Sequence, residues 1–205
     1  MNILGNTDWA QKYRPRNLQE VVLPSAIEKK LTQTVKEGSG MSLLFYGRQG
    51  TGKTSTACAI NPDSLFHVDC SRDRSIGMVR NLLDKCSSVC LHGRRVVVLD
   101  EIDSLTAEAQ NALKGAIERL SACNDFVGVT NHIEKVPDAI KSRLYPVSFD
   151  HPRDSSYTDR IESRLRVVLA AEGRRDPPSA VLRAIVRDAF PDIRSMLKRL
   201  QFETA

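Results

Sequence analysis

The sequence Gly47-Arg48-Gln49-Gly50-Thr51-Gly52-Lys53-Thr54 decides the fold of this chain, because it matches the pattern G-x-x-x-x-G-K-[ST] at every fixed position. An apolar run at residues 42–46 precedes it and is typical of a buried strand, while residues 55–60 continue as a helix. In such a unit the glycines let backbone N–H groups face a polyanion, and the helix N-terminus adds partial positive charge. The stretch therefore predicts a nucleotide site.

This loop predicts specific contacts with ATP and Mg²⁺. The Lys53 ammonium would reach the β- and γ-phosphates, and the Thr54 hydroxyl would ligate Mg²⁺. The alternative is a chance glycine-rich turn in an unrelated fold, and the strand before and helix after the loop count against it. The nucleotide-binding residues predicted here are Gly47, Gly50, Thr51, Gly52, Lys53, Thr54 and Ser55.

An acidic pair follows a second buried strand. Residues 96–99 are all apolar, as in a parallel strand covered on both faces, and Asp100 and Glu101 come directly after them, at the edge where open α/β sheets bind ligands. Asp100 would hold the Mg²⁺ shell, and Glu101 would accept a proton from the attacking water or orient it. An ordinary acidic turn would explain the pair alone. Its position about 45 residues after the phosphate loop favours a hydrolytic nucleotide site.

The remaining pattern alternates strands with helices. It predicts an α/β fold with a five-stranded parallel sheet and flanking helices. The expected strands are residues 42–46, 65–69, 95–99, 126–131 and 145–149, and the expected helices are 25–37, a segment from 76, 104–121 and 137–143.

Several polar residues in this pattern have more than one interpretation. Asn131 ends a strand where it could meet a γ-phosphate or water. Considered alone, Arg143 is a favourable charge at a helix C-terminus. Arg74 and Arg80 are explained as a solvated helix face unless other signals point to a partner. The proline-punctuated segment at residues 8–24 is either a strap packed on the core or a binding element.

The strand-like runs stop after residue 149. Apolar residues then recur at helical spacing in three segments, 157–172, 178–190 and 191–202. We therefore expect one domain at residues 1–149, a boundary at 150–154, and a small three-helix lid within residues 150–205, with ATP bound between the two.

Composition limits the possible settings. The 205-residue chain carries a net charge of +5 and has a sequence pI near 9.0, which favours a polyanionic partner without identifying nucleic acid. Its five cysteines form no C-x-x-C pair, so we expect a reducing, intracellular (cytoplasmic) setting and no zinc site. No segment approaches the roughly 18 apolar residues of a membrane span, and the N-terminus does not resemble a signal peptide.

Taken in order, the motifs resemble the AAA+ ATPases, and among them the small subunits of sliding-clamp loaders such as replication factor C and the T-even-type bacteriophage loader. The resemblance covers residues 9–201. The resembling stretches are Lys12-Tyr13-Arg14-Pro15, Asp100-Glu101-Ile102-Asp103-Ser104-Leu105-Thr106, Ala109-Gln110-Asn111-Ala112-Leu113-Lys114, Thr130-Asn131 and Pro191-Asp192-Ile193-Arg194.

This resemblance implies roles for residues outside the phosphate loop. It places Arg194 of the lid on the phosphates, Asn131 as a sensor of the γ-phosphate, and Arg143 as a catalytic residue acting in trans on a neighbouring subunit's site. The stretch Ser142-Arg143-Leu144 departs from the family's S-R-C but keeps the arginine. The implied adenine-pocket residues are Tyr13, Arg14, Pro15, Val21 and Val22, and the implied DNA-backbone contacts are Arg74, Arg80 and Lys114.

The resemblance also implies partners. They are a sliding clamp, primer–template DNA and other loader subunits, which together form a hetero-oligomer, a pentamer in this family. The implied location is the cytoplasm, a host's in the case of a phage, or the nucleus of a eukaryote. Loaders carry a third, helical collar domain, which we expect to be absent because the chain stops at Ala205. The expected function is ATP-driven loading of a ring clamp onto primed DNA. The alternatives are another DNA-acting AAA+ ATPase, such as a helicase loader or branch-migration motor, and an ATP-binding adaptor with little hydrolysis of its own.

Overall fold

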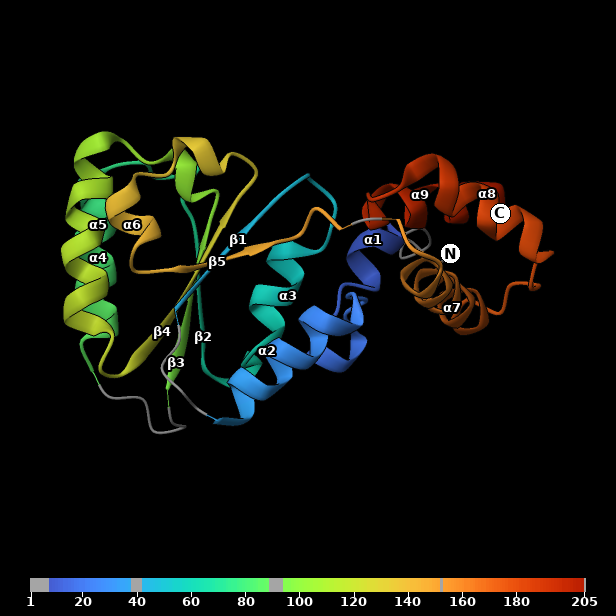
Figure 1. Cartoon of the computed structure of the whole chain (residues 1–205), viewed down its shortest axis with the longest axis horizontal. Coiled ribbons are helices and arrows are strands. Elements are labelled where there is room, and N and C mark those ends of the chain that lie inside the picture. The colour runs from blue at the N-terminus through green and yellow to red at the C-terminus, as the bar shows by residue number, and fades with distance from the viewer. Residues whose placement is uncertain (1–7, 38–41, 89–93, 152, 205) are drawn as a thin grey trace, which may run out of the picture.

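The computed structural model describes residues 8–37, 42–88, 94–151 and 153–204. Its centre is a five-stranded sheet in the order β2-β3-β4-β1-β5, in which every neighbouring pair is parallel (Figure 1). The predicted α/β fold and its five parallel strands are confirmed. The strands are β1 (Leu43–Tyr46), β2 (Leu65–Asp69), β3 (Arg95–Asp100), β4 (Asn124–Thr130) and β5 (Tyr145–Ser148).

Helices cover both faces of the sheet because alternate strand residues point to opposite sides. Val97 and Leu99 of β3 pack in the core formed with α4 (Ile76–Cys86) and α5 (Ala107–Leu120), next to the short α6 (Asp138–Lys141). Val96 and Val98 pack on the opposite face, against α2 (Ser25–Glu37) and α3 (Lys53–Ala59). Burial on both faces explains why the central strands are continuously apolar in sequence.

Three helices follow the sheet and form the lid: α7 (Ser155–Ala171), α8 (Ser179–Ala189) and α9 (Ile193–Glu203). They enclose their own apolar cluster, to which Trp9 of the short helix α1 (Trp9–Lys12) also belongs. Figure 1 shows α1 beside α9, between the sheet layers and the rest of the lid. The three predicted helices are confirmed. The N-terminal strap, residues 8–24, packs on both layers, with Trp9 in the lid cluster and Val21 and Leu23 in the cluster beside α2 and α3.

Some boundaries differ from the prediction. Helix α5 begins at Ala107 rather than at Ser104, because Thr106 is its N-cap and accepts a hydrogen bond from Ala109 N at 3.2 Å. The preceding residues form a separate 3₁₀ turn, and further 3₁₀ turns connect other elements. These turns are Leu18–Glu20, Pro62–Ser64, Ile102–Ser104 and Ile133–Lys135.

Strand β4 starts two residues earlier than its apolar run suggests. Asn124 is buried, and its Nδ2 donates to Cys86 O at 3.1 Å and to Leu120 O at 2.9 Å. A polar residue that looks like part of a turn therefore joins the ends of α4 and α5 to the sheet.

Two sequence expectations concern residues outside the described ranges. They are the end expected for the helix at 25–37, where Gly38-Ser39-Gly40 follows, and one of the five cysteines, Cys90. Within those ranges, none of the helices is both long enough and apolar enough to cross a membrane.

Candidate nucleotide-binding site

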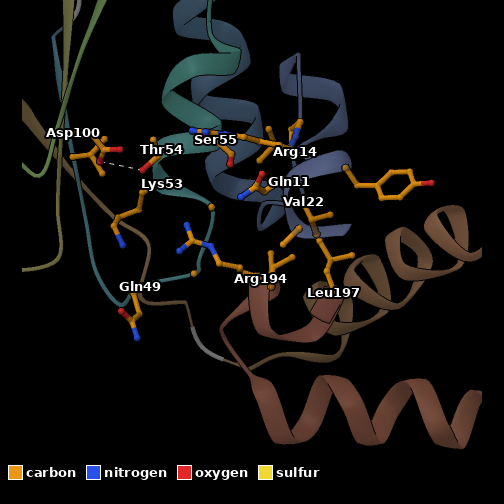
Figure 2. Close-up of a pocket in the computed structure, with 18 of the residues that line it drawn as sticks. Gln11, Arg14, Val22, Gln49, Lys53, Thr54, Ser55, Asp100, Arg194 and Leu197 are labelled. Carbon is orange, nitrogen blue, oxygen red and sulfur yellow. Dashed lines mark hydrogen bonds between the residues drawn. The ribbon is translucent and has the colours of Figure 1, made fainter. Parts of the chain in front are cut away.

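One pocket collects most of the predicted site residues. It is a cavity of about 880 Å³ bordered by the carboxyl end of the sheet, the phosphate loop, the N-terminal segment and α9 (Figure 2). The predicted residues that line it are Tyr13, Arg14, Pro15, Val21, Val22, Gly50, Gly52, Lys53, Thr54, Ser55, Asp100, Glu101, Asn131 and Arg194.

The phosphate loop has the backbone shape that its glycines predict. Gly47, Gly50 and Gly52 have φ values of 132°, 75° and 91°, which residues other than glycine rarely adopt. Thr51, although predicted to bind the nucleotide, is buried below the loop and donates through Oγ1 to Arg48 O at 2.9 Å. Thr51 and Gly47 therefore shape the loop rather than line the pocket.

Lys53 is held inside this loop. Its Nζ donates to Gly47 O at 2.7 Å and to Arg48 O at 2.5 Å, and the residue is 5% exposed. Burial lowers the pKa of the ammonium to about 8, although Asp150 and Asp100 favour its charged form. The loop thus keeps a cation in place with few water contacts, ready to meet a polyanion.

Asp100 and Thr54 form an oxygen pair suited to Mg²⁺. Thr54 Oγ1 donates to Asp100 Oδ1 at 3.1 Å, the contact drawn in Figure 2. Hydroxyl and carboxylate oxygens are ligands that Mg²⁺ accepts, and it commonly takes its remaining ligands from phosphates and water. Within the described ranges no group of three or more His, Cys, Asp or Glu residues could hold a metal alone. The residues present fit an ion shared with a nucleotide.

Glu101 has an unusual backbone next to this pair. Its φ of 53° is the only positive φ of a non-glycine residue in the described chain, a conformation that costs about 1–2 kcal/mol. The turn that follows is tied to β4, because Thr130 Oγ1 donates to Asp103 Oδ1 at 2.6 Å. The exposed Asn131 comes directly after Thr130 and lines the same pocket.

The lid meets the phosphate loop at the start of α9. Ile193 N donates to Gly50 O at 3.0 Å, and the carboxylate of Asp192 lies close to the Cα of Gly50. Arg194 follows on the first turn of the helix, and Figure 2 shows its side chain directed toward the phosphate loop. Arg194 therefore extends from the lid toward the phosphate loop, and its contact with a phosphate stays a prediction.

The N-terminal strap closes the other end of the pocket and ties it to the lid. Tyr13 Oη donates to Glu172 Oε1 at 2.5 Å, and Lys12 Nζ contacts the same oxygen at 2.6 Å. Arg164 of α7 donates to Tyr13 O at 3.4 Å. Val22 packs against the lid cluster, so this end offers apolar surface near polar backbone groups.

Arg143 lies away from the pocket, at the end of α6. Its Nε donates to Glu118 Oε1 at 2.8 Å, its Nη2 also contacts Glu118, and its Nη1 donates to Ala139 O at 2.5 Å. The hydrogen bonding of Arg143 to Glu118 lowers the pKa of the Glu118 carboxyl. Arg143 therefore does not line this pocket, and its role in trans stays a prediction.

The predicted DNA contacts are also outside the pocket. Arg74 and Arg80 are exposed, and Lys114 is partly exposed on α5, which packs against α4. Arg74 O accepts a hydrogen bond from Thr106 N at 3.0 Å, so the segments that begin α4 and α5 lie side by side.

The sequence did not indicate several other pocket residues. His67 of β2 places Nε2 at 3.6 Å from Asp100 Oδ2, and Gln49 extends from the phosphate loop. His67 lies near the carboxyl end of a predicted strand, which was a usable signal. Asp150 is outside the pocket lining but supports the phosphate loop, because its Oδ1 accepts from Arg48 N at 2.9 Å. It had no local signal, since its partner is distant in sequence. The remaining unpredicted lining residues include Gln11, Arg164, Leu197 and Lys198.

Comparison with known proteins supports this arrangement. Residues 43–149, which are more than half of the chain, match the model of the ATPase family associated with various cellular activities (AAA).

Comparisons that extend over nearly the whole of this chain give more specific relatives. The chain is 33% identical to replication factor C subunit 3 of Saccharomyces cerevisiae, over 96% of this chain and 59% of that protein. It is 30% identical to replication factor C small subunit 2 of Pyrobaculum islandicum, over 96% of this chain and 63% of that protein. The chain thus spans about three fifths of the length of these relatives.

Solved structures of similar fold include the RuvB T158V protein of Thermotoga maritima. It superposes with a TM-score of 0.77 at 18% identity and covers 92% of this chain and 64% of that chain. This likeness supports the fold alone.

Proposed function

Because the chain belongs to the AAA family of ATPases, we propose that it is an ATPase subunit of a sliding-clamp loader, which uses ATP to open a ring clamp and load it onto primed DNA. The proposal has two supports. The pocket brings together a phosphate loop, an acidic strand end and a lid arginine. The similarity to replication factor C subunits extends over 96% of the chain, well beyond the residues shared by phosphate-loop proteins in general.

The observation that carries the ATPase assignment is the convergence of Lys53, Glu101 and Arg194 on one cavity. The Lys53 ammonium would bind the β- and γ-phosphates. Glu101 would take a proton from the water whose oxygen attacks the γ-phosphorus, while the bond from that phosphorus to the β,γ-bridging oxygen breaks and ADP leaves with phosphate. Asn131 would orient the water or the γ-phosphate, and Arg194 would contact that phosphate from the lid.

Thr54 and Asp100 would hold Mg²⁺ through the oxygens that face each other at 3.1 Å. When bound, the ion would neutralise negative charge that develops on the phosphates. The strap residues Tyr13, Arg14 and Pro15, with Val21 and Val22, would enclose the adenine. We further propose residues 1–149 as the ATPase domain and 150–205 as the lid, with the strap packed on the lid.

Arg143 is proposed to complete the site of a neighbouring loader subunit, a role that requires assembly. Arg74, Arg80 and Lys114 are proposed to contact the DNA backbone. Arg74 is supported by its place at the adjacent beginnings of α4 and α5, because helix N-termini and basic side chains both favour phosphates. Arg80 and Lys114 lie further along these two helices, and their support is the resemblance to clamp loaders. These partners place the protein where DNA is replicated, in the nucleus of a eukaryote or in a cytoplasm that contains the DNA.

The test is steady-state ATPase activity with and without primed DNA and the cognate clamp. We expect DNA and clamp together to stimulate turnover, and Glu101→Gln to reduce it about 10²–10⁴-fold while ATP still binds. Glu203→Gln, which removes an exposed carboxylate outside the pocket at the end of α9, is the matched control and should leave turnover unchanged.

The rival functions predict different results. Turnover that responds to DNA but not to the clamp would support another DNA-acting ATPase. Turnover that stays low with clamp, DNA and all natural partner subunits present would support an ATP-binding adaptor.

A further inference from the structure

The carboxylate of Asp192 joins the lid to the phosphate loop. Its Oδ1 accepts a hydrogen bond from Ser195 N at 2.9 Å, and its Oδ2 accepts one from Ser195 Oγ at 2.7 Å. The same carboxylate lies against Gly50, where an added Cβ would be 1.9 Å from Oδ1 and 2.2 Å from Cγ. The next residue, Ile193, donates through N to Gly50 O at 3.0 Å. Gly50 of the phosphate loop therefore contacts the start of α9 twice, once through the Asp192 carboxylate and once through Ile193 N.

We propose that Asp192 is a positioning residue for Arg194. The inference rests on the proposed function, in which Arg194 contacts the γ-phosphate. Within the described ranges, Ile193 and Arg194 line the pocket, whereas Asp192 does not. Asp192 thus acts through the backbone that it holds. It fixes the first turn of α9, and its contact with Gly50 sets the position from which Arg194 extends toward the loop.

A second lid helix shows what a capping aspartate does without this contact. Asp154 Oδ1 accepts a hydrogen bond from Tyr157 N at 2.7 Å, which is the same i to i+3 capping bond at the start of α7. Asp192 differs in that its carboxylate also rests on the phosphate loop. Asp154 is therefore a matched control for the loss of a helix cap.

Removing the contact should weaken catalysis through Arg194. Displacing a catalytic contact by about 1 Å can cost about 10²-fold in rate. We therefore expect Asp192→Gly to lower kcat/KM for ATP by about 10–100-fold. Glycine is itself a good N-cap residue, so this variant keeps α9 capped while it removes the carboxylate from Gly50. The affinity for ATP should fall more than the affinity for ADP, because ADP has no γ-phosphate.

The experiment compares five variants of the full chain: Asp192→Gly, Asp192→Asn, Arg194→Ala, the Asp192→Gly/Arg194→Ala double variant and Asp154→Gly. For each, kcat/KM and the dissociation constants of ATP and ADP are measured. Asp192→Asn keeps an oxygen for the cap and a side chain of the same size on Gly50, so it should remain close to wild type. Asp154→Gly should also remain close to wild type. The double variant should be no worse than Arg194→Ala, because both changes remove the same contact.

The outcomes separate this inference from the proposed function. The inference is overturned while the function stands if Arg194→Ala impairs the enzyme but Asp192→Gly does not. The same holds if Asp192→Gly only matches Asp154→Gly, or if the double variant loses the product of the two single effects. If Arg194→Ala itself changes nothing, the role of Arg194 falls and this inference falls with it. Glu101→Gln then shows independently whether the chain is an ATPase.

Discussion

Lys53 places an ammonium group in a buried part of the nucleotide pocket. Its neighbours in the loop are carbonyl oxygens, and burial lowers its pKa to about 8 from an ordinary value of 10.5. Below pH 8 both the folded and the unfolded chain carry the proton, so the folded chain bears the full cost of burying the charge. Between about pH 8 and 10.5 the folded chain has released the proton while the unfolded chain still holds it.

We therefore expect Lys53 to make the folded chain more stable as the pH rises through this window. Relative to Lys53→Met, the free energy of unfolding of the wild type should increase by about 3 kcal/mol between pH 8 and 10.5, at about 1.4 kcal/mol per pKa unit. Urea denaturation of both proteins at several pH values gives this difference, because other titrating groups cancel between them. Parallel stability curves would show that the pKa of Lys53 is not lowered.

At the same residue scale, the sequence identified the chemistry of the site better than its geometry. The Lys53, Thr54, Asp100 and Glu101 positions follow from short motifs, because each motif lies within one strand-to-helix connection and fixes its own local backbone. The positive φ of Glu101 could not be predicted, since glutamate has no preference for that conformation and the surrounding fold imposes it.

At the scale of elements, the N-terminal strap packs into the lid although the two lie at opposite ends of the sequence. Trp9 is 4% exposed inside the lid cluster, and its backbone N donates to Gln201 Oε1 at 2.9 Å. A large aromatic side chain buried among lid residues should stabilise the lid and the strap together. The end of the pocket that is proposed to enclose the adenine is made of the same strap, so its order depends on this packing.

Trp9→Ala should therefore destabilise the chain by about 3–5 kcal/mol, the usual cost of removing a buried large aromatic side chain. Urea denaturation followed by circular dichroism measures this change. The matched control is Phe202→Ala on α9, which removes an aromatic side chain that is 85% exposed. It should change the free energy of unfolding by no more than about 0.5 kcal/mol. Equal effects of the two substitutions would contradict the packing role of the strap.

Periodicity predicted the existence of the strands and the lid helices, but not all of their ends. The start of α5 depends on the Thr106 cap, and the start of β4 depends on the buried hydrogen bonds of Asn124. Contacts such as Asp192 with Gly50 are invisible in sequence because they join residues that only the tertiary fold brings together. The strap was left open between two interpretations for the same reason, since Trp9 meets its partners at the far end of the chain.

At the scale of the whole molecule, the pocket and Arg143 belong to different surfaces. The pocket lies between the phosphate loop, the strap and the lid, whereas Arg143 is held at the end of α6 by Glu118 on α5. Figure 1 shows α5 and α6 at the side of the sheet away from the lid. Chains that associate head to tail could bring the Arg143 surface of one to the pocket of the next, whereas a single chain cannot.

This separation predicts that two inactive variants restore activity to each other. Lys53→Ala destroys its own site but keeps Arg143, and Arg143→Ala keeps its site but loses the arginine, a group worth about 10³–10⁵-fold in related reactions. In an equal mixture under conditions where chains assemble, roughly a quarter of head-to-tail contacts would pair an intact site with an intact arginine. We therefore expect ATPase turnover to return to about that fraction of wild type, and to depend on protein concentration. A mixture no more active than its separate components would exclude a trans role of Arg143 between copies of this chain, because only an arginine acting on another copy can be supplied by a chain whose own site is destroyed.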